Sequence, residues 1–274
     1  LQGKNPDVVN AAKTYVGKDV SITADAVTEG DGGKVIVWAD DTTHFYGDIS
    51  STGGALLGDG GFVEVSGKEL LNFKGLVDLR ASQGGNGTLL LDPTNIEISA
   101  AVTSIENDGG PDPFTYSDVS NDGPSPSILN VTDLVNQLAL SDVIVTTAST
   151  AGDAGDITLT TNLDYDGIGT SSLTLVANNN INITGGTITD GTPGGDTLNL
   201  TLNADSDASG AGSLTISQLI ETNNGTINLL AEDFIFSGAG IDAGSADIFL
   251  TETQVAGPLT FGDEFDQTEV DLLS

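Results

Sequence analysis

Paired carboxylates are the residues of this chain whose spacing first suggests chemistry. Three pairs of aspartates stand close together in the sequence: Asp40 with Asp41, Asp153 with Asp156, and Asp164 with Asp166. An inverting glycosidase needs two carboxyl groups on one face, about 6.5–9.5 Å apart. Such pairs arise by chance among 40 Asp and Glu residues. We therefore interpret them as solvated turn residues and predict no catalytic residue.

Other catalytic groups are scarce. His44 is the only histidine, and the chain has no cysteine. We expect His44 to be a surface residue of a strand, beside Phe45 and Tyr46. A uronate lyase needs a basic residue, and none follows Arg80. Thiol, zinc and Ser-His-Asp chemistry are thus unsupported, and a polysaccharide hydrolase remains only the less favoured alternative to a non-enzymatic protein.

Calcium is the one ligand that the sequence suggests. Hard cations prefer clustered carboxylate and carbonyl oxygens, and acidic segments at 107–113, 117–122 and 151–159 offer them. The candidate calcium ligands in these segments are Asp108, Asp112, Asp118, Asp122, Asp153 and Asp156. The alternative interpretation is that they form ordinary turns in which the aspartate side chain bonds the backbone. No other cofactor is expected.

The charge of the chain limits its partners. Asp and Glu outnumber Lys and Arg by 40 to 7, so the formal net charge is -33, and every positive side chain lies at or before Arg80. A surface this acidic excludes nucleic acid and anionic lipid as partners. No run of eighteen apolar residues occurs, so no transmembrane segment is predicted.

Glycine turns and short apolar pairs indicate how the chain folds. The stretch "GDGGFVEVSGKELLNFKGLVDLRA" (58–81) contains three apolar pairs separated by turns: Val63 with Val65, Leu71 with Phe73, and Val77 with Leu79. Three short strands and three corners are typical of one coil of a parallel β-helix. At roughly 20–25 residues per coil and about 4.8 Å of rise, we expect on the order of 11–14 coils and a rod of some 50–65 Å. A sandwich of hairpins is the alternative.

The rest of the chain repeats this pattern around one interruption. Further strands are expected at 19–24, 33–39, 44–50, 87–92, 95–99, 156–161, 172–177, 181–184, 197–204, 213–217, 226–231 and 246–251. A polar segment at 106–127 predicts a long loop excursion. Apolar residues then follow the i, i+3, i+4, i+7 spacing of a helix at Val131, Leu134, Val135 and Leu138. We expect a short helix near 131–140, capped by Thr132 or Asp133.

These elements predict an all-β parallel β-helix in three parts: a first half at 1–105, the loop excursion and short helix at 106–140, and a second half at 141–274. Stacked carboxylates about 4.8 Å apart repel by roughly 1 kcal/mol even in water. Neutral ladders are therefore expected on the outer faces. Asparagines beside strands are expected at left-handed corners, where they can stack: Asn178, Asn179, Asn180, Asn223 and Asn224.

Three stretches resemble a known family. "GGKVIVWADDTTHFYGDISSTGG" (32–54), "GDGGFVEVSGK" (58–68) and "GTLLLDPTNIEIS" (87–99) are similar to filamentous-haemagglutinin-like exoproteins of two-partner secretion systems in Gram-negative bacteria. The resemblance implies a secreted, right-handed parallel β-helix that is exported through an outer-membrane partner and serves adhesion, aggregation or biofilm structure. The family's secretion domain carries Asn-Pro-Asn motifs, and only Asn5-Pro6-Asp7 approaches them here. The chain therefore resembles an interior shaft segment.

The resemblance sets expectations for location and partners. An extracellular or bacterial cell-surface location is implied, with glycans or proteins of host cells, neighbouring cells or matrix as partners. Head-to-tail association of copies is a further expectation. The alternative function is a calcium-dependent extracellular matrix module.

Overall fold

The computed structural model describes Asp7 and residues 9–101, 126–148, 153–192, 194–238 and 240–253, together with the strand Leu272–Leu273. Most of the predicted excursion at 106–127 lies outside these residues. So do four predicted calcium ligands, Asp108, Asp112, Asp118 and Asp122.

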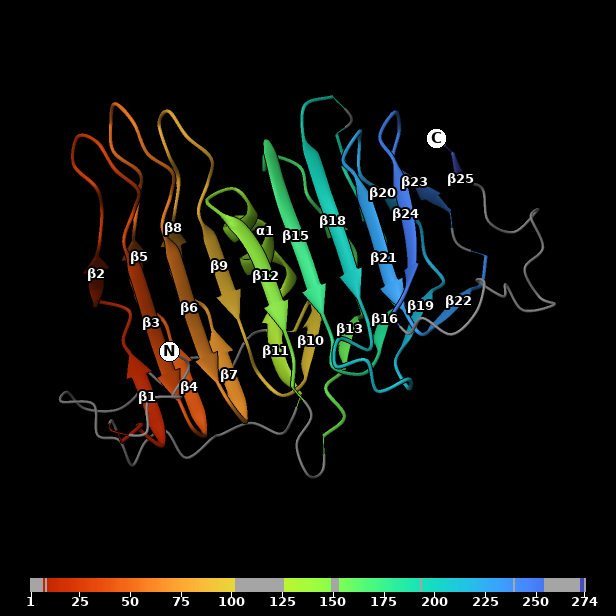
Figure 1. Cartoon of the computed structure of the whole chain (residues 1–274), viewed down its shortest axis with the longest axis horizontal. Helices are drawn as coiled ribbons and strands as arrows, with labels where there is room; N and C mark the ends of the chain where they lie inside the picture. Colours follow the sequence, from red (N-terminus) through yellow and green to blue (C-terminus); the bar gives the residue numbers. More distant parts are fainter. Residues whose placement is uncertain are drawn as a thin grey trace.

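The chain winds into a parallel β-helix with three faces. The longest face is a sheet of eight parallel strands. Its strands in spatial order are β3 (Lys34–Ala39), β6 (Phe62–Gly67), β9 (Thr88–Leu91), β12 (Asp142–Thr146), β15 (Thr170–Val176), β18 (Thr197–Asn203), β21 (Ile227–Ala231) and β24 (Ile248–Glu252). In Figure 1 these strands lie in front and run downward while the coil advances to the right, so the coil is right-handed. The predicted fold class is confirmed.

The second face contains two parallel groups. The first group is β1 (Lys13–Val16), β4 (Thr42–Phe45) and β7 (Leu70–Phe73). The second group is β11 (Ser127–Asn130), β10 (Ile96–Ser99), β13 (Ile157–Leu159), β16 (Ile181–Ile183), β19 (Ser213–Ile216) and β22 (Asp233–Phe236). The hydroxyl of Ser127 accepts the backbone N–H of Leu71 at 2.9 Å. Strand β11 thus lies between β7 and β10, out of sequence order.

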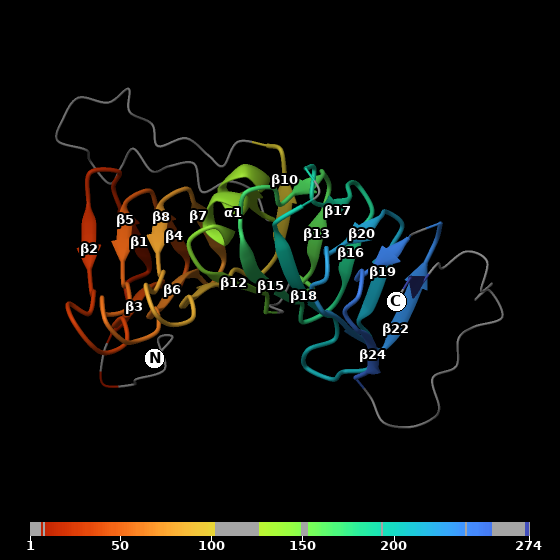
Figure 2. The ribbon, with the colours of Figure 1, turned by 90° about the horizontal axis from the view of Figure 1, so that it is seen from above.

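The third face is interrupted by the helix α1 (Val131–Leu138). Before the helix lie β2 (Ser21–Thr23), β5 (Asp48–Ser50) and β8 (Leu76–Asp78). After it lie β14 (Leu163–Asp164), β17 (Ile188–Thr189), β20 (Ile220–Glu221), β23 (Ile241–Asp242) and β25 (Leu272–Leu273). The helix contacts both β8 and β14, and Figure 2 shows it midway along the coil. It occupies the place of one strand.

The coils are longer than predicted. In the long sheet Lys34 pairs with Phe62, and Phe62 pairs in turn with Thr88, so each of these coils takes up more chain than the sequence suggested. Only the last step of this sheet, from Ile227 to Ile248, has the predicted length. The expectation of 11–14 coils is therefore wrong for the long sheet, which has eight described strands and extends only about 34 Å. The reason is that strand alternation fixes the strands but not the length of the corners between them.

One apolar core runs through both halves of the coil. Inward positions form ladders: Val65 pairs with Leu91 and Leu91 with Val145, and all three are buried. Phe45 and Phe73 stack with their ring centroids 5.6 Å apart. Each fully buried side chain of this kind contributes roughly 1.5–3 kcal/mol relative to exposure. The stacked coils are thus held together by apolar contact as well as by strand pairing.

The outer faces carry neutral ladders, as predicted. Thr174 lies opposite Thr201, and Thr201 lies opposite Asn228. Among the paired strand positions that the structure describes, two carboxylates face each other once, at Glu221 and Asp242. Carboxylates are instead concentrated in the turns, where they can spread into solvent.

The prediction that asparagines beside the strands occupy left-handed corners is only partly confirmed. Asn223 and Asn224 adopt left-handed backbone conformations, with φ of 51° and 69°. Asn178, Asn179 and Asn180 do not. Their corner is instead fixed by side-chain hydrogen bonds, and Asn179 donates its amide to Asp156 at 2.8 Å.

The helix forms close to its predicted position but with a different cap. The side-chain oxygen of Asn130 accepts the backbone N–H groups of Thr132 at 2.9 Å and Asp133 at 3.4 Å. The expectation that Thr132 or Asp133 caps the helix is wrong, because β11 runs directly into α1 and the helix begins already at Val131.

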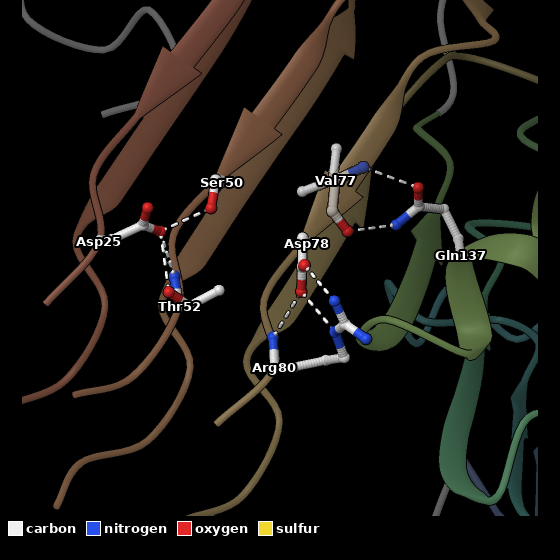
Figure 3. A network of polar contacts seen from close by, with 7 residues as sticks. All are labelled: Asp25, Ser50, Thr52, Val77, Asp78, Arg80 and Gln137. Carbon is white, nitrogen blue, oxygen red and sulfur yellow. Dashed lines mark hydrogen bonds and ion pairs between the residues drawn. The ribbon is translucent and has the colours of Figure 1, made fainter. Parts of the chain in front are cut away.

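Gln137 of α1 completes the neighbouring strand. Its side chain is only 1% exposed. Its amide oxygen accepts the N–H of Val77 at 2.9 Å, and its amide nitrogen donates to the carbonyl of Val77 at 2.8 Å (Figure 3). The side-chain amide therefore replaces the peptide group that a further strand would have offered to β8.

Candidate functional site

The predicted pair Asp40 and Asp41 is tied into a turn. Asp40 accepts hydrogen bonds from the side chains of Asn10 at 2.9 Å and Trp38 at 3.2 Å. Asp41 accepts one from the hydroxyl of Thr42 at 3.1 Å. These contacts agree with the interpretation of the pair as turn residues.

Asp153 and Asp156 bond amides of neighbouring coils. Asp153 accepts the side-chain amide of Asn95 at 2.7 Å. Asp156 accepts the side chain of Asn179 and the backbone N–H of Asn180, at 2.8 and 3.0 Å. These two predicted calcium ligands thus take part in a ladder of polar side chains across three coils.

His44 is not the surface residue that the sequence suggested. It is 3% exposed, because both sides of β4 are buried. Its Nδ1 lies 2.9 Å from the side-chain nitrogen of Asn72 and 3.3 Å from the hydroxyl of Tyr46. The imidazole is therefore part of a buried polar contact between adjacent coils.

Three aspartates converge at one corner of the second half, and we call them the acidic cluster: Asp166, Asp190 and Asp196. One carboxylate oxygen from each lies within 4.8 Å of the other two. Asp166 follows β14, Asp190 follows β17, and Asp196 precedes β18. Because β14 and β17 are paired neighbours, their carboxyl ends meet at the same corner.

The corner holds these carboxylates in place. Asp196 accepts the backbone N–H of Gly167 at 2.9 Å, and Asp190 accepts that of Thr192 at 3.1 Å. Asn223, from the next coil, donates its amide to the backbone carbonyl of Asp196 at 2.7 Å. Exposure falls from Asp166, which faces solvent, to Asp190, which is 7% exposed.

The surroundings of the cluster are strongly negative. Tyr165 is fully buried beside it and donates its hydroxyl to the backbone carbonyl of Glu221 at 2.9 Å. Burial raises the pKa of Tyr165, and the charges of Asp190, Glu221 and Asp196 raise it further. The negative charges that disfavour ionisation of Tyr165 would favour a cation bound at the same corner.

The geometry of the cluster fits a hard divalent cation. Calcium binds oxygen at about 2.3–2.6 Å, so two oxygens on one ion are at most about 5 Å apart. The oxygens of the cluster meet this limit. A set made only of carboxylates suits calcium, magnesium or manganese better than the softer metals that select thiolate or imidazole.

Sequence reasoning found only part of this cluster. The spacing in the sequence pairs Asp166 with Asp164, but it does not indicate that Asp190 and Asp196 lie beside Asp166. Asp164 pairs with Thr189, the residue before Asp190, so Asp190 lies one coil further along the chain.

No protein-family model matches the chain, and no curated protein matches it either. Within the described residues, the single helix has eight residues, and no helix could cross a membrane.

Proposed function

We propose that the chain is a non-enzymatic structural protein, a shaft segment of an adhesin or extracellular fibre that acts in adhesion, aggregation or biofilm matrix. The observation that supports this most is the continuous sheet of eight parallel strands over one core. Each coil pairs with the next and packs against it, so the shaft can lengthen by further coils without a new domain. Neutral ladders on the outer faces allow such stacking despite a net charge of -33.

The family resemblance supports a location and partners for this shaft. The similar stretches at 32–54 and 58–68 contain β3 and β6, which are adjacent coils of the long sheet. By analogy we propose export through an outer-membrane partner to the cell surface or the extracellular space. Partners there would be glycans or proteins of host cells, neighbouring cells or matrix, and other copies of the chain.

The test is to present the chain to immobilised cell-surface and matrix glycans and to measure retention and release of reducing sugar together. We expect saturable retention without sugar release, because an adhesive surface binds without turnover. Saturable sugar release that is lost on Asp40→Asn or Asp41→Asn would instead make the protein a polysaccharide hydrolase. Absence of retention both on every glycan and on intact cells would contradict the adhesive function.

A calcium-dependent matrix module is the second candidate, and the acidic cluster is the observation that favours it. The three carboxylates come from two successive coils, so one bound ion would join these coils. An ion that binds only the folded chain stabilises it by about 2.7 kcal/mol at a hundredfold excess over its dissociation constant.

We therefore expect calcium chloride to raise the melting temperature more than sodium chloride does at matched ionic strength. The Asp190→Asn variant should lose this calcium-specific gain, while both salts still relieve charge repulsion by screening. Asp153→Asn and Asp156→Asn are the matched controls. Equal shifts of the melting temperature in the two salts would contradict the calcium-dependent module and leave the plain structural shaft. If only the control variants lose the calcium-specific shift, the ion binds at the predicted 151–159 segment instead.

A further inference from the structure

Two neighbouring corners of the first half carry large, exposed apolar side chains. One corner, residues 24–33, joins β2 to β3, and the next, residues 51–61, joins β5 to β6. Figure 1 shows both as long loops beyond β2 and β5. Val27 is 86% exposed, Leu56 is 66% exposed and Leu57 is 63% exposed. We call these three residues the apolar tip.

Backbone hydrogen bonds join the two corners that carry the tip. The N–H of Ala55 donates to the carbonyl of Val27 at 3.4 Å. The N–H of Gly30 donates to the carbonyl of Leu57 at 2.8 Å. The tip is therefore built on paired backbone, and little conformational entropy is lost when its side chains contact a partner.

The exposure of the two leucines does not depend on where the coil begins. Their corner is bonded to the first corner on one side, and on the other side the N–H of Gly60 donates to the carbonyl of Gly85 at 2.9 Å. Leu56 and Leu57 thus stay exposed with a coil on either side. The corresponding corner of the third coil has only Ser-Gln-Gly-Gly-Asn at 82–86, so stacking does not require apolar side chains here.

The charges around the tip are all negative. Residues 19–33 and 48–67 contain no Lys or Arg. The carboxylates of Glu29, Asp31 and Asp59 are exposed beside the tip. A second copy of the chain would bring the same carboxylates against them, and anionic lipid would be repelled. A surface whose outermost charge is positive would be attracted.

We propose that the apolar tip inserts into a lipid surface with choline headgroups, as in a membrane of phosphatidylcholine. The trimethylammonium group is the outermost charge of such a headgroup and can pair with Glu29, Asp31 and Asp59. The aliphatic side chains of the tip then reach the boundary between headgroups and acyl chains.

The size of the tip favours lipid over a protein partner. A stable protein interface buries roughly 800 Å² on each partner, which is more than one valine and two leucines supply. Peripheral lipid binding depends instead on a few apolar side chains that enter the headgroup region. The inference goes beyond the proposed function, whose partners are glycans, proteins and other copies of the chain.

The test is flotation of the full chain with phosphatidylcholine vesicles at about 0.15 M salt. We expect the wild type to float with the vesicles. Leu56→Ser and Leu57→Ser should each lower the partition coefficient by about fivefold or more, because each removes apolar surface from the lipid contact. Adding anionic lipid to the vesicles should weaken binding, since it repels the carboxylates beside the tip.

Leu76→Ser is the matched control, because Leu76 is 44% exposed and lies at the start of β8, away from the tip. It should bind the vesicles as the wild type does. All three serine variants should keep the circular dichroism spectrum of the wild type, since substitutions of exposed residues change stability little.

A second measurement reports insertion directly. The chain has no cysteine, so Ala55→Cys gives a single attachment point for a polarity-sensitive dye beside the tip. Its emission should shift to the blue on phosphatidylcholine vesicles. Ser206→Cys, at an exposed position of the second half, should show no shift.

Three results would each overturn the proposal: a wild type that does not float, leucine variants that bind as the wild type does, or a dye at position 55 that does not shift. Leucine-dependent binding to intact cells without binding to vesicles would assign the tip to a protein partner instead. Glycan retention by a chain that ignores the vesicles would remove this inference and leave the proposed function standing.

Discussion

Replacing Gln137 with leucine is expected to lower the free energy of unfolding by about 2–6 kcal/mol, because two buried backbone groups lose their partners and each costs about 1–3 kcal/mol. The Gln137→Leu variant keeps the volume of the buried side chain but leaves the N–H and the carbonyl of Val77 without the hydrogen bonds that Gln137 provides. This is a large share of the roughly 5–15 kcal/mol that stabilises an ordinary domain. Urea unfolding followed by circular dichroism measures it.

A second substitution at the same position separates hydrogen bonding from packing. In the Gln137→Glu variant, an ionised carboxylate can accept from the N–H of Val77 but cannot donate to its carbonyl. Only the protonated acid can do both, so the folded state raises the pKa of the introduced carboxyl. The stability that the protonated side chain contributes to the variant is fully present below the pKa of this carboxyl in the unfolded chain. It is lost as the pH rises through the raised pKa of the folded state. We expect a deficit at pH 7 that narrows at about pH 5.

Asn136→Leu is the control, because Asn136 is exposed on the same helix. A change within about 0.5 kcal/mol is expected there. If Gln137→Leu is as stable as the wild type, the side-chain amide does not complete β8, and the helix is held by apolar contacts alone.

Gly60→Ala should lower the free energy of unfolding by an amount comparable to that of Gln137→Leu. A β-carbon at Gly60 would stand 1.7 Å from the carbonyl oxygen of Leu79 and 2.3 Å from the backbone nitrogen of Gly87. Both are backbone atoms of the next coil, which cannot turn away as a side chain can. The coils must move apart, so we expect a loss of about 3 kcal/mol or more in the free energy of unfolding.

Gly85→Ala tests whether the loss at Gly60 is steric. Gly85 lies in the same glycine-rich corner, but its nearest neighbour to an added β-carbon is Oδ1 of Asp59 at 3.9 Å. That variant should remain within about 0.5 kcal/mol of the wild type. Equal losses in the two variants would mean that glycine is needed here for another reason than the close approach of coils.

The fold class follows from local sequence because strand alternation and turn chemistry are local properties. Val63 and Val65 alternate with Glu64 and Ser66 in a stretch bounded by glycines, and they lie in β6 as predicted. The spacing from Val131 to Leu138 predicted the helix for the same reason. The coil length was missed because it depends on corners such as 52–60, whose length no alternation fixes.

Of the three aspartates in the acidic cluster, the sequence alone indicated only Asp166. Asp164 and Asp166 are close neighbours along the chain and could be noticed together. Asp190 and Asp196 come from the next coil, and their approach depends on which strand stacks on β14. Stacking register is a long-range property, so no local pattern could bring these carboxylates together.

Strand alternation and glycine spacing by themselves determined that this chain is a parallel β-helix, and the helical spacing from Val131 to Leu138 determined its one short helix, because each pattern is decided within a few residues. The tertiary structure alone decided what each polar side chain does. Gln137 on an isolated amphipathic helix has no assigned partner. It is buried here because, among the described strands, β8 is paired on one side only, with β5, and Gln137 bonds Val77 on the other side. His44 is buried although strand alternation places it outward, because both sides of β4 are covered. Such roles are set by what packs against a residue across coils, and that information is spread over segments far apart in the chain.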